Sequence, residues 1–197
     1  MSSGASPIAS VPTLAGLLWP AAGPAGRALR AAGLMLAGSL LLALSAKVQV
    51  PFPPVPMTLQ TLIVLVIGAA YGWRLGAATV ALYLAEGLMG FPVFAGPVAG
   101  PLYMAGPTGG FLVGFVAAAA LTGFLAERGW DRPLLRVVGL MALGHAVIFA
   151  FGLTWLSVLL GPAKAWAVGA APFVLATVLK TALAAALMQA AWSLARR

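Results

Sequence analysis

The sequence predicts an all-α integral membrane protein: a bundle of six transmembrane helices with structured Pro/Gly-rich extracellular loops and both termini in the cytoplasm. Three observations lead to this fold class. Of the 197 residues, 62% are apolar and 7% are charged, whereas a soluble domain carries about 25% charged residues. Apolar segments near the roughly 20 residues that one membrane span needs recur along the chain. The cations are concentrated in alternate connections between these segments.

The apolar helices are expected in chain order, each separated from the next by glycine, proline or charged residues. Before them, residues 1–26 are expected to form a cytoplasmic tail with an interfacial turn near 14–19, since they lack the basic n-region of a signal peptide. The membrane domain then covers residues 27–197. Its six helices are predicted at 28–46, 58–70, 75–90, 110–126, 137–160 and 172–194.

The distribution of cations sets the predicted orientation. With a cytoplasmic N-terminus, the outer connections contain only Lys47 and Lys164, and both termini are cytoplasmic. Lys/Arg-rich connections stay on the cytoplasmic side. The inner ones contain Arg27, Arg30, Arg74, Arg128, Arg132, Arg136, Arg196 and Arg197.

Residues 91–109 form a connection that is rich in proline and glycine yet retains large apolar side chains, such as Phe94 and Tyr103. Proline and glycine interrupt helices, and irregular backbone at membrane depth must line protein or water. Two interpretations remain: a structured cap over a binding pocket, or a tight extracellular loop.

The segment 47–57, KVQVPFPPVPM, is stiffened by four prolines and cannot continue a helix. The helix that follows is short for a full span, so the connection is expected to dip into the protein. Thr58 and Gln60 would then lie at the mouth of a cavity. The alternative is that Thr58 caps the helix and Gln60 is buried with its hydrogen bonds satisfied.

Two ionisable residues, Glu86 and Lys180, lie within apolar helices at comparable depth. An isolated charge there costs about 2.5–3.5 kcal/mol or more, so each should face protein or water. Either they form a structural ion pair, or Lys180 extends outward to the interface, or Lys180 binds a ligand carboxylate.

The first helix carries small residues at four-residue spacing, Gly33 with Ala37 and Ser39 with Ala43. Such spacing lets another helix approach closely in lipid. The neighbour is either another helix of the same bundle or a partner protein.

Several classes of function are excluded or disfavoured. The chain has no cysteine and one histidine, His145, so no polyhistidine or thiolate metal site is expected; His145 is interpreted as a packing or hydrogen-bonding residue. The cations are scattered rather than gathered in a stripe, which argues against nucleic-acid binding. No GxSxG, HExxH or phosphate loop is present, so nothing indicates catalysis or ATP binding.

Three motifs resemble one known family. PPVPMTLQTL at 53–62, GFPVFAG at 90–96 and GPTGGFLVGF at 106–115 are similar to signatures of BioY, the biotin-binding S component of energy-coupling factor (ECF) transporters. GLTWL at 152–156 and the PF…LK pattern ending at Lys180 add to the resemblance, which covers about residues 34–185.

The resemblance implies a six-helix bundle in the bacterial cytoplasmic (inner) membrane that binds biotin from outside and is not itself an enzyme. It implies no cofactor; its partners would be a transmembrane T component, two ATPase subunits and the lipid bilayer. The T component would dock on the first helix at Gly33, Ala37, Ser39 and Ala43. The family's ligand-binding positions correspond to Thr58, Gln60, Tyr83, Glu86, Phe94, Thr108, Phe111, Trp155 and Lys180.

One departure from the family pattern concerns the sixth helix. Family members commonly have PGDxxK, but this chain has Ala176 and Thr177 before Lys180, so the usual aspartate is missing. We hypothesise that Glu86 supplies the missing charge. Other functions left open are an S component for another vitamin such as thiamine or riboflavin, an intramembrane enzyme using Glu86, His145 and Lys180, and a scaffold subunit without a ligand.

Overall fold

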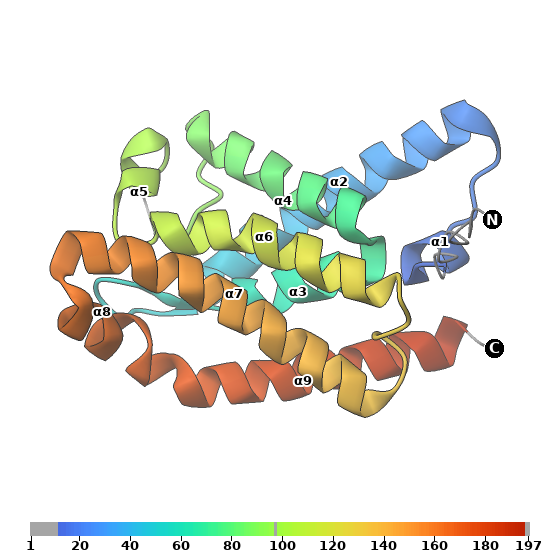
Figure 1. Cartoon of the computed structure of the whole chain (residues 1–197). Helices are drawn as coiled ribbons and strands as arrows, with labels where there is room; N and C mark the ends of the chain where they lie inside the picture. The colour runs from blue at the N-terminus through green and yellow to red at the C-terminus, as the bar shows by residue number, and fades with distance from the viewer. Residues whose placement is uncertain (1–11, 97, 196–197) are drawn as a thin grey trace, which may run out of the picture.

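The computed structural model describes residues 12–96 and 98–195, which are almost entirely helical (Figure 1). One two-residue strand pair, β1 (Gln49–Val50) with β2 (Met57–Thr58), and a 3₁₀ turn at Ala171–Phe173 complete the regular structure. The helices are α1 (Leu14–Leu18), α2 (Gly23–Lys47), α3 (Gln60–Tyr71), α4 (Trp73–Leu88), α5 (Pro101–Ala105), α6 (Gly109–Ala126), α7 (Leu134–Leu160), α8 (Pro162–Gly169) and α9 (Val174–Ala195).

All six predicted helices are present, as α2, α3, α4, α6, α7 and α9. Among the described residues, four helical stretches are long and apolar enough to cross a membrane: Gly23–Lys47, Gly109–Ala126, Leu134–Leu160 and Pro162–Ala195. With 12 residues, α3 extends only about 18 Å at 1.5 Å per residue. It is therefore short for a hydrocarbon core of about 30 Å.

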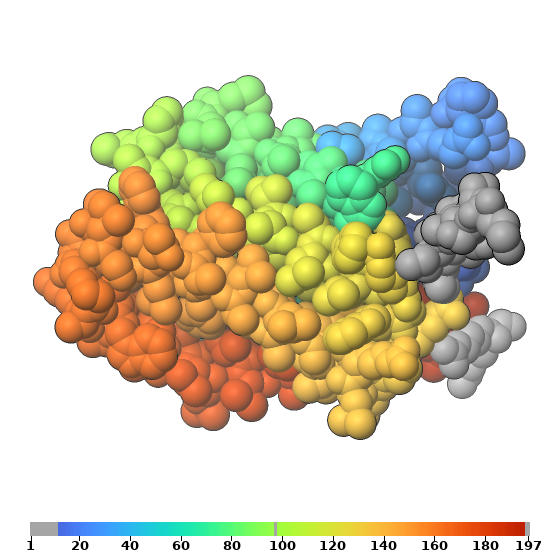
Figure 2. All heavy atoms as spheres, in the orientation of Figure 1, coloured from blue at the N-terminus to red at the C-terminus, as the bar shows by residue number. Residues whose placement is uncertain are grey.

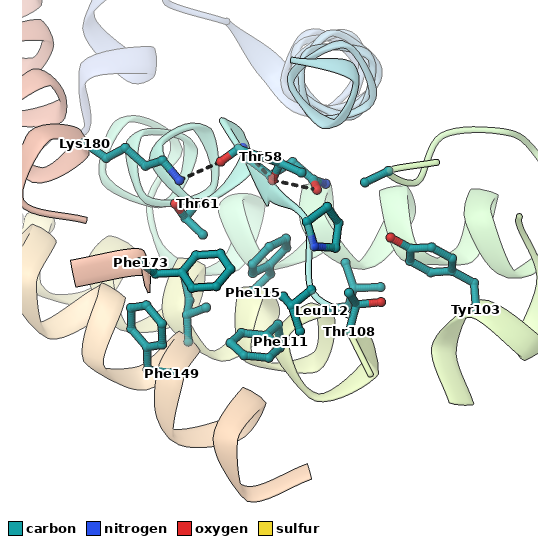
Figure 3. A pocket seen from close by; sticks show the side chains of 15 residues that line it. Thr58, Thr61, Tyr103, Thr108, Phe111, Leu112, Phe115, Phe149, Phe173 and Lys180 are labelled. Atoms are coloured by element: carbon teal, nitrogen blue, oxygen red, sulfur yellow. Dashed lines mark hydrogen bonds between the residues drawn. The ribbon is translucent and has the colours of Figure 1, made fainter. Parts of the chain in front are cut away.

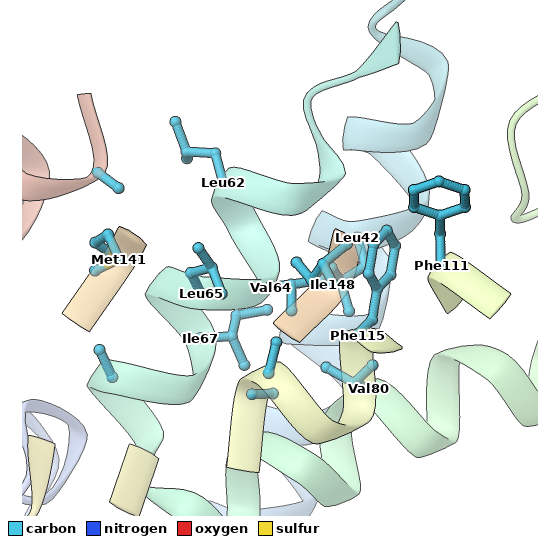
Figure 4. Packing of buried hydrophobic residues seen from close by; sticks show 14 of the residues in the cluster. Leu42, Leu62, Val64, Leu65, Ile67, Val80, Phe111, Phe115, Met141 and Ile148 are labelled. Atoms are coloured by element: carbon cyan, nitrogen blue, oxygen red, sulfur yellow. The ribbon is translucent and has the colours of Figure 1, made fainter. Parts of the chain in front are cut away.

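The short helix α3 lies at the centre of the bundle and contacts α2, α4, α6, α7 and α9. Every one of its residues is buried or half-buried. Figure 4 shows α3 side chains such as Leu62 and Leu65 among residues from the surrounding helices. A helix that is apolar on all sides is expected in such a position.

Helices α6 and α7 pack closely side by side across one face of the molecule (Figure 2). Their approach depends on small residues: a Cβ atom added at Gly114 would lie 3.0 Å from Phe151 Cβ and 3.2 Å from the Ile148 Cα. One at Gly110 would overlap Trp155. Gly110 and Gly114 therefore permit the close approach of the two helices, since no side chain separates the backbones there.

The two ends of the bundle differ in their connections (Figure 1). The segments α5, α8 and the loop between β1 and β2 lie at one end, whereas α1 and the last turns of α9 lie at the other. The three elaborate connections therefore lie at the same end of the bundle.

At the end of the bundle where α1 lies, hydrogen bonds that involve side chains hold the connection between α6 and α7 against α9 and α4. Trp192 Nε1 donates a hydrogen bond to Asp131 Oδ2 at 3.0 Å, and Gln189 Nε2 donates to the Arg132 carbonyl at 2.7 Å. Glu127 Oε1 accepts from the Trp73 amide at 3.1 Å, which places a carboxylate at the N-terminus of α4, where the helix dipole favours it.

The structure departs from the sequence expectation in three connections. Residues 1–11 of the expected tail lie outside the described part, but α1 packs against α3 and α9 with Leu14 buried, and α2 begins at Gly23. The expected loop at Lys164 contains α8, and the segment 91–109 contains α5. Both helices have proline at the first position, which is a known start signal that the sequence interpretation missed.

Candidate ligand-binding site

A cavity lies beneath the segment 91–109, between α3, α6, α7 and α9 (Figure 3). Its empty volume is about 520 Å³, including the part that is continuous with the outside. The lining residues are Val55, Pro56, Thr58, Gln60, Thr61, Ala95, Tyr103, Thr108, Phe111, Leu112, Phe115, Ile148, Phe149, Phe173 and Lys180.

The proline-rich segment forms a hairpin that brings Thr58 into the cavity wall. Gln49 pairs with Thr58 across the two strands, and the Leu59 amide donates to the Val48 carbonyl at 3.0 Å. The Thr58 carbonyl then accepts a hydrogen bond from Lys180 Nζ at 2.6 Å. The cation of α9 is therefore held against the start of α3, where it faces the cavity.

A chain of buried hydrogen bonds links the start of α3 with α4. Thr58 Oγ1 donates to Gln60 Oε1 at 3.1 Å, and Gln60 Nε2 donates to the Tyr83 hydroxyl at 2.7 Å. That hydroxyl in turn donates to the Val93 carbonyl at 3.1 Å. Thr58 and Gln60 both line the cavity, and Gln60 is buried with its hydrogen bonds made, but Thr58 is not the helix cap, because the N-cap of α3 is Leu59. Such a network fixes its members in place, because breaking one bond leaves a buried group unpaired.

Aromatic rings form one side of the cavity. Phe173 contacts Phe149 edge-to-face with centroids 6.4 Å apart, and Phe149 contacts Phe111 in the same way at 6.2 Å. Phe52 of the hairpin packs on the outer side of Phe173 at 6.1 Å. Edge-to-face contacts are a preferred arrangement of aromatic pairs, so these rings form a continuous apolar wall. Phe149 is absent from the predicted site, because its position in the middle of α7 carries no motif.

The segment 91–109 is anchored over the cavity through Phe94, which is 1% exposed. Its ring stacks on Tyr103 at 4.9 Å and meets Tyr83 edge-to-face at 5.6 Å. The ring occupies the space where a side chain at Gly87 would lie, so only glycine fits there. Lys47 Nζ donates to the Phe94 carbonyl at 2.7 Å, which ties the segment to the end of α2.

Tyr103 and Thr108 complete the cavity at the end opposite Lys180 (Figure 3). Burial raises the pKa of the Tyr103 hydroxyl above its usual value of 10.0, so the group stays neutral and can donate or accept. Sequence reasoning missed Tyr103 as a site residue. The sequence signal that could have identified Tyr103 is its place in the Pro/Gly-rich segment, which also contains the predicted site residue Phe94.

Four predicted site residues lie outside the cavity wall: Tyr83 and Phe94, whose contacts are given above, and Trp155 and Glu86. Trp155 Nε1 donates to the Gly106 carbonyl at 2.9 Å and so fixes the end of the segment to α7. Glu86 accepts a hydrogen bond from the Ser39 hydroxyl, between α4 and α2. Lys180 instead binds the Thr58 carbonyl. The geometry therefore supports neither a Glu86–Lys180 ion pair nor the hypothesis that Glu86 replaces the missing aspartate.

His145 is 2% exposed and lies one turn below Phe149 on α7. Its Nδ1 is 3.0 Å from the Met141 carbonyl oxygen and 3.1 Å from Thr181 Oγ1. These contacts are those of a packed, hydrogen-bonded histidine. Within residues 12–96 and 98–195, no group of three or more His, Cys, Asp or Glu side chains could hold a metal ion.

The four predicted docking residues do not share one face of α2. Ala37 is exposed on the side that carries exposed leucines, whereas Gly33 is half-buried and faces the Trp19 ring. Ser39 is 1% exposed and binds Glu86 of α4, and Ala43 packs against the core. A helix turns by about 100° per residue, so the two pairs, which are offset by six residues, point in different directions.

The fold and the cavity together define a class: a helical membrane protein with a cavity beneath a Pro/Gly-rich segment and a lysine at one end of that cavity. Comparisons with known proteins agree. The sequence model of the BioY family matches residues 19–197. The chain belongs to the BioY family.

Named relatives cover most of the chain. A probable biotin transporter BioY of Pyrococcus horikoshii is 35% identical over 144 residues, which are 73% of this chain and 85% of the relative. The biotin transporter BioY of Thermotoga maritima is 36% identical over 146 residues, 74% and 85% of the two chains. The biotin transporter BioY of Rhizobium etli is 37% identical over 158 residues, which are 76% of this chain and 84% of the relative.

One solved structure shares the fold. It is the S-component for biotin from an ECF-type ABC transporter, with a TM-score of 0.73 over 85% of this chain and 93% of that one. The two sequences are 20% identical, so this likeness supports the arrangement of the helices and not the details of the site.

Proposed function

We propose that this chain binds biotin in the cavity and serves as the substrate-specific subunit of an ECF-type uptake system. The observation that carries the proposal is the arrangement of the cavity: Lys180 at one end, Thr108 and Tyr103 at the other, and aromatic rings between them. Biotin has a carboxylate at one end, an apolar valeryl chain and thiophane ring, and a polar ureido ring at the other end. These groups match the cavity in order.

The relatives support biotin over other vitamins, since three with 35–37% identity are named biotin transporters or probable ones. Thiamine and riboflavin have no carboxylate for Lys180 to bind. An enzyme that uses Glu86, His145 and Lys180 is disfavoured, because the first two are engaged with Ser39 and with Met141 and Thr181. A scaffold without a ligand does not account for the cavity.

Within the cavity, we assign direct ligand contacts to the predicted residues that line it, and supporting roles to Tyr83 and Phe94 behind it. Glu86 and Trp155 stabilise the surrounding helices. The residues assigned to direct contact are Thr58, Gln60, Thr108, Phe111 and Lys180.

The assembly follows from the same proposal. The chain crosses the bacterial cytoplasmic membrane with six helices and has both termini inside, so the cavity opens outward. It has no cofactor, and a T component with two ATPase subunits supplies the energy for transport. The T component docks on the outward face of α2 around Gly33 and Ala37, where close helix approach is possible.

Thermal unfolding of the detergent-purified protein tests the proposal. A ligand present at 100 times its dissociation constant stabilises the folded state by about 2.7 kcal/mol. We expect biotin to raise the unfolding temperature, and thiamine and riboflavin to leave it unchanged. A shift with one of the other vitamins would assign a different substrate, and no shift with any of them would support the scaffold interpretation.

A further inference from the structure

Thr61, on the first turn of α3, lines the cavity but is absent from the predicted site. Its hydroxyl oxygen is shielded from solvent and has no hydrogen-bond partner among the residues that the structure describes. Most buried polar atoms in proteins do have a partner. An unpaired hydroxyl on a cavity wall is therefore available to a ligand.

Two buried threonines elsewhere in the bundle bind their own helix. Thr79 Oγ1 donates to the Leu75 carbonyl at 2.7 Å, and Thr122 Oγ1 donates to the Ala118 carbonyl at 2.9 Å, each four residues back. A threonine within a helix commonly donates a hydrogen bond to the carbonyl four residues before it. The residue four positions before Thr61 is Met57, which belongs to strand β2 and not to the helix. The position of Thr61 at the start of α3 thus removes its local acceptor.

The unpaired hydroxyl lies at the cationic end of the cavity. Lys180 Nζ binds the carbonyl of Thr58, three residues before Thr61, at 2.6 Å. Figure 3 shows the Lys180 and Thr61 side chains at the same end of the cavity, away from Tyr103 and Thr108. An ammonium group has three N–H donors, and the Thr58 carbonyl takes one of them. The others remain available at the end where Thr61 lies.

We propose that Thr61 is a ligand-binding residue whose hydroxyl donates a hydrogen bond to the carboxylate that Lys180 attracts. The inference rests on the proposed function and deepens it, because it makes the cavity selective for a carboxylate over a neutral end group. A hydrogen bond to a charged acceptor is roughly twice as strong as one between neutral groups. Thr61 therefore favours biotin over an analogue whose carboxylate has become a carboxamide.

Equilibrium binding of radiolabelled biotin, with biotinamide as a competitor, tests this inference. Thr61→Val keeps the side-chain shape and removes the hydroxyl, whereas Thr61→Ser keeps the hydroxyl. We expect Thr61→Val to weaken biotin binding about tenfold or more and biotinamide binding only about threefold, since bonds to charged acceptors contribute more. Thr61→Ser should remain close to the wild type. Thr122→Val is the matched control, because it removes a buried hydroxyl that does not line the cavity.

An unchanged biotin affinity in Thr61→Val would overturn the inference. Equal losses for biotin and biotinamide would do so as well, since the hydroxyl would then not discriminate between the end groups. If Thr61→Val does not fold, Thr61→Ala takes its place with the same criteria. A wild-type protein that is folded but binds no biotin would instead contradict the proposed function, and the inference would fall with it.

Discussion

The wall of the cavity and the outward face of α2 are built from opposite kinds of helix. Around the cavity, α3 has no exposed residue and begins with a polar hydrogen-bonded network. On α2, Leu29, Leu36, Leu40 and Leu44 are 57–72% exposed. Apolar side chains need no burial in lipid, so this face can meet acyl chains or a partner helix. The proposed function thus places ligand recognition and partner docking on different helices.

One contact joins these two regions. The Ser39 hydroxyl on the inner side of α2 donates to Glu86 of α4, and Tyr83 lies one turn before Glu86 on the same helix. Tyr83 belongs to the network behind the cavity. Away from this contact, substitutions in the two regions should separate ligand binding from partner association.

The largest expected effect on biotin binding comes from Lys180→Ala. It removes the cation that faces the carboxylate and leaves the Thr58 carbonyl without its partner. Truncating one member of a buried charge pair costs about 2–5 kcal/mol, so the dissociation constant should rise at least about 30-fold. Equilibrium binding measures it, with Lys164→Ala on the exposed side of α8 as the control. An unchanged affinity would mean that the carboxylate binds elsewhere.

Tyr83→Phe should have the next largest effect. The substitution leaves Gln60 Nε2 without its acceptor and the Val93 carbonyl without its donor. Unpaired buried groups cost about 1–3 kcal/mol each, so the unfolding temperature should fall and biotin should bind about tenfold more weakly. Tyr71→Phe, on the far end of α3, provides the comparison. Equal effects of the two substitutions would show that the network does not position the site.

Glu86→Gln should change biotin affinity less than about threefold, because Gln can still accept a hydrogen bond from Ser39 and the residue lies outside the cavity wall. The same binding assay measures the effect. A loss comparable with that of Lys180→Ala would restore the hypothesis that Glu86 supplies the charge missing near Lys180.

Ala37→Trp should leave biotin binding unchanged and disrupt assembly with the T component. Ala37 is exposed on α2, and a large side chain there prevents close helix approach. Co-purification with a tagged T component measures association, with Leu187→Trp on the exposed side of α9 as the control. Normal assembly of Ala37→Trp would place the docking surface elsewhere.

Much of the fold could be predicted from the sequence, because long apolar segments and their cations leave few alternatives. Helices lie at the six predicted positions, and Thr58, Gln60, Thr108, Phe111 and Lys180 line one cavity. The motifs that contain them lie at helix starts, where sequence signals are strongest. What the sequence did not indicate was the hairpin at 49–58, since two-residue strands have no periodicity.

The remaining site residues depend on tertiary packing. Phe149 lies in the middle of a long apolar helix, where nothing in the sequence distinguishes the cavity face from the lipid face. The partners of Glu86 and Lys180 could not be derived from depth alone, because depth does not give the direction in which a side chain points. Ser39 and Ala43 failed as exposed docking residues for the same reason.

A crystal structure of the protein with bound biotin tests the central claim most directly. The account predicts biotin in the cavity beneath the segment 91–109, with a carboxylate oxygen about 2.7–2.9 Å from Lys180 Nζ and the ureido ring near Tyr103 and Thr108. Biotin in the reverse orientation, or bound outside this cavity, would contradict it.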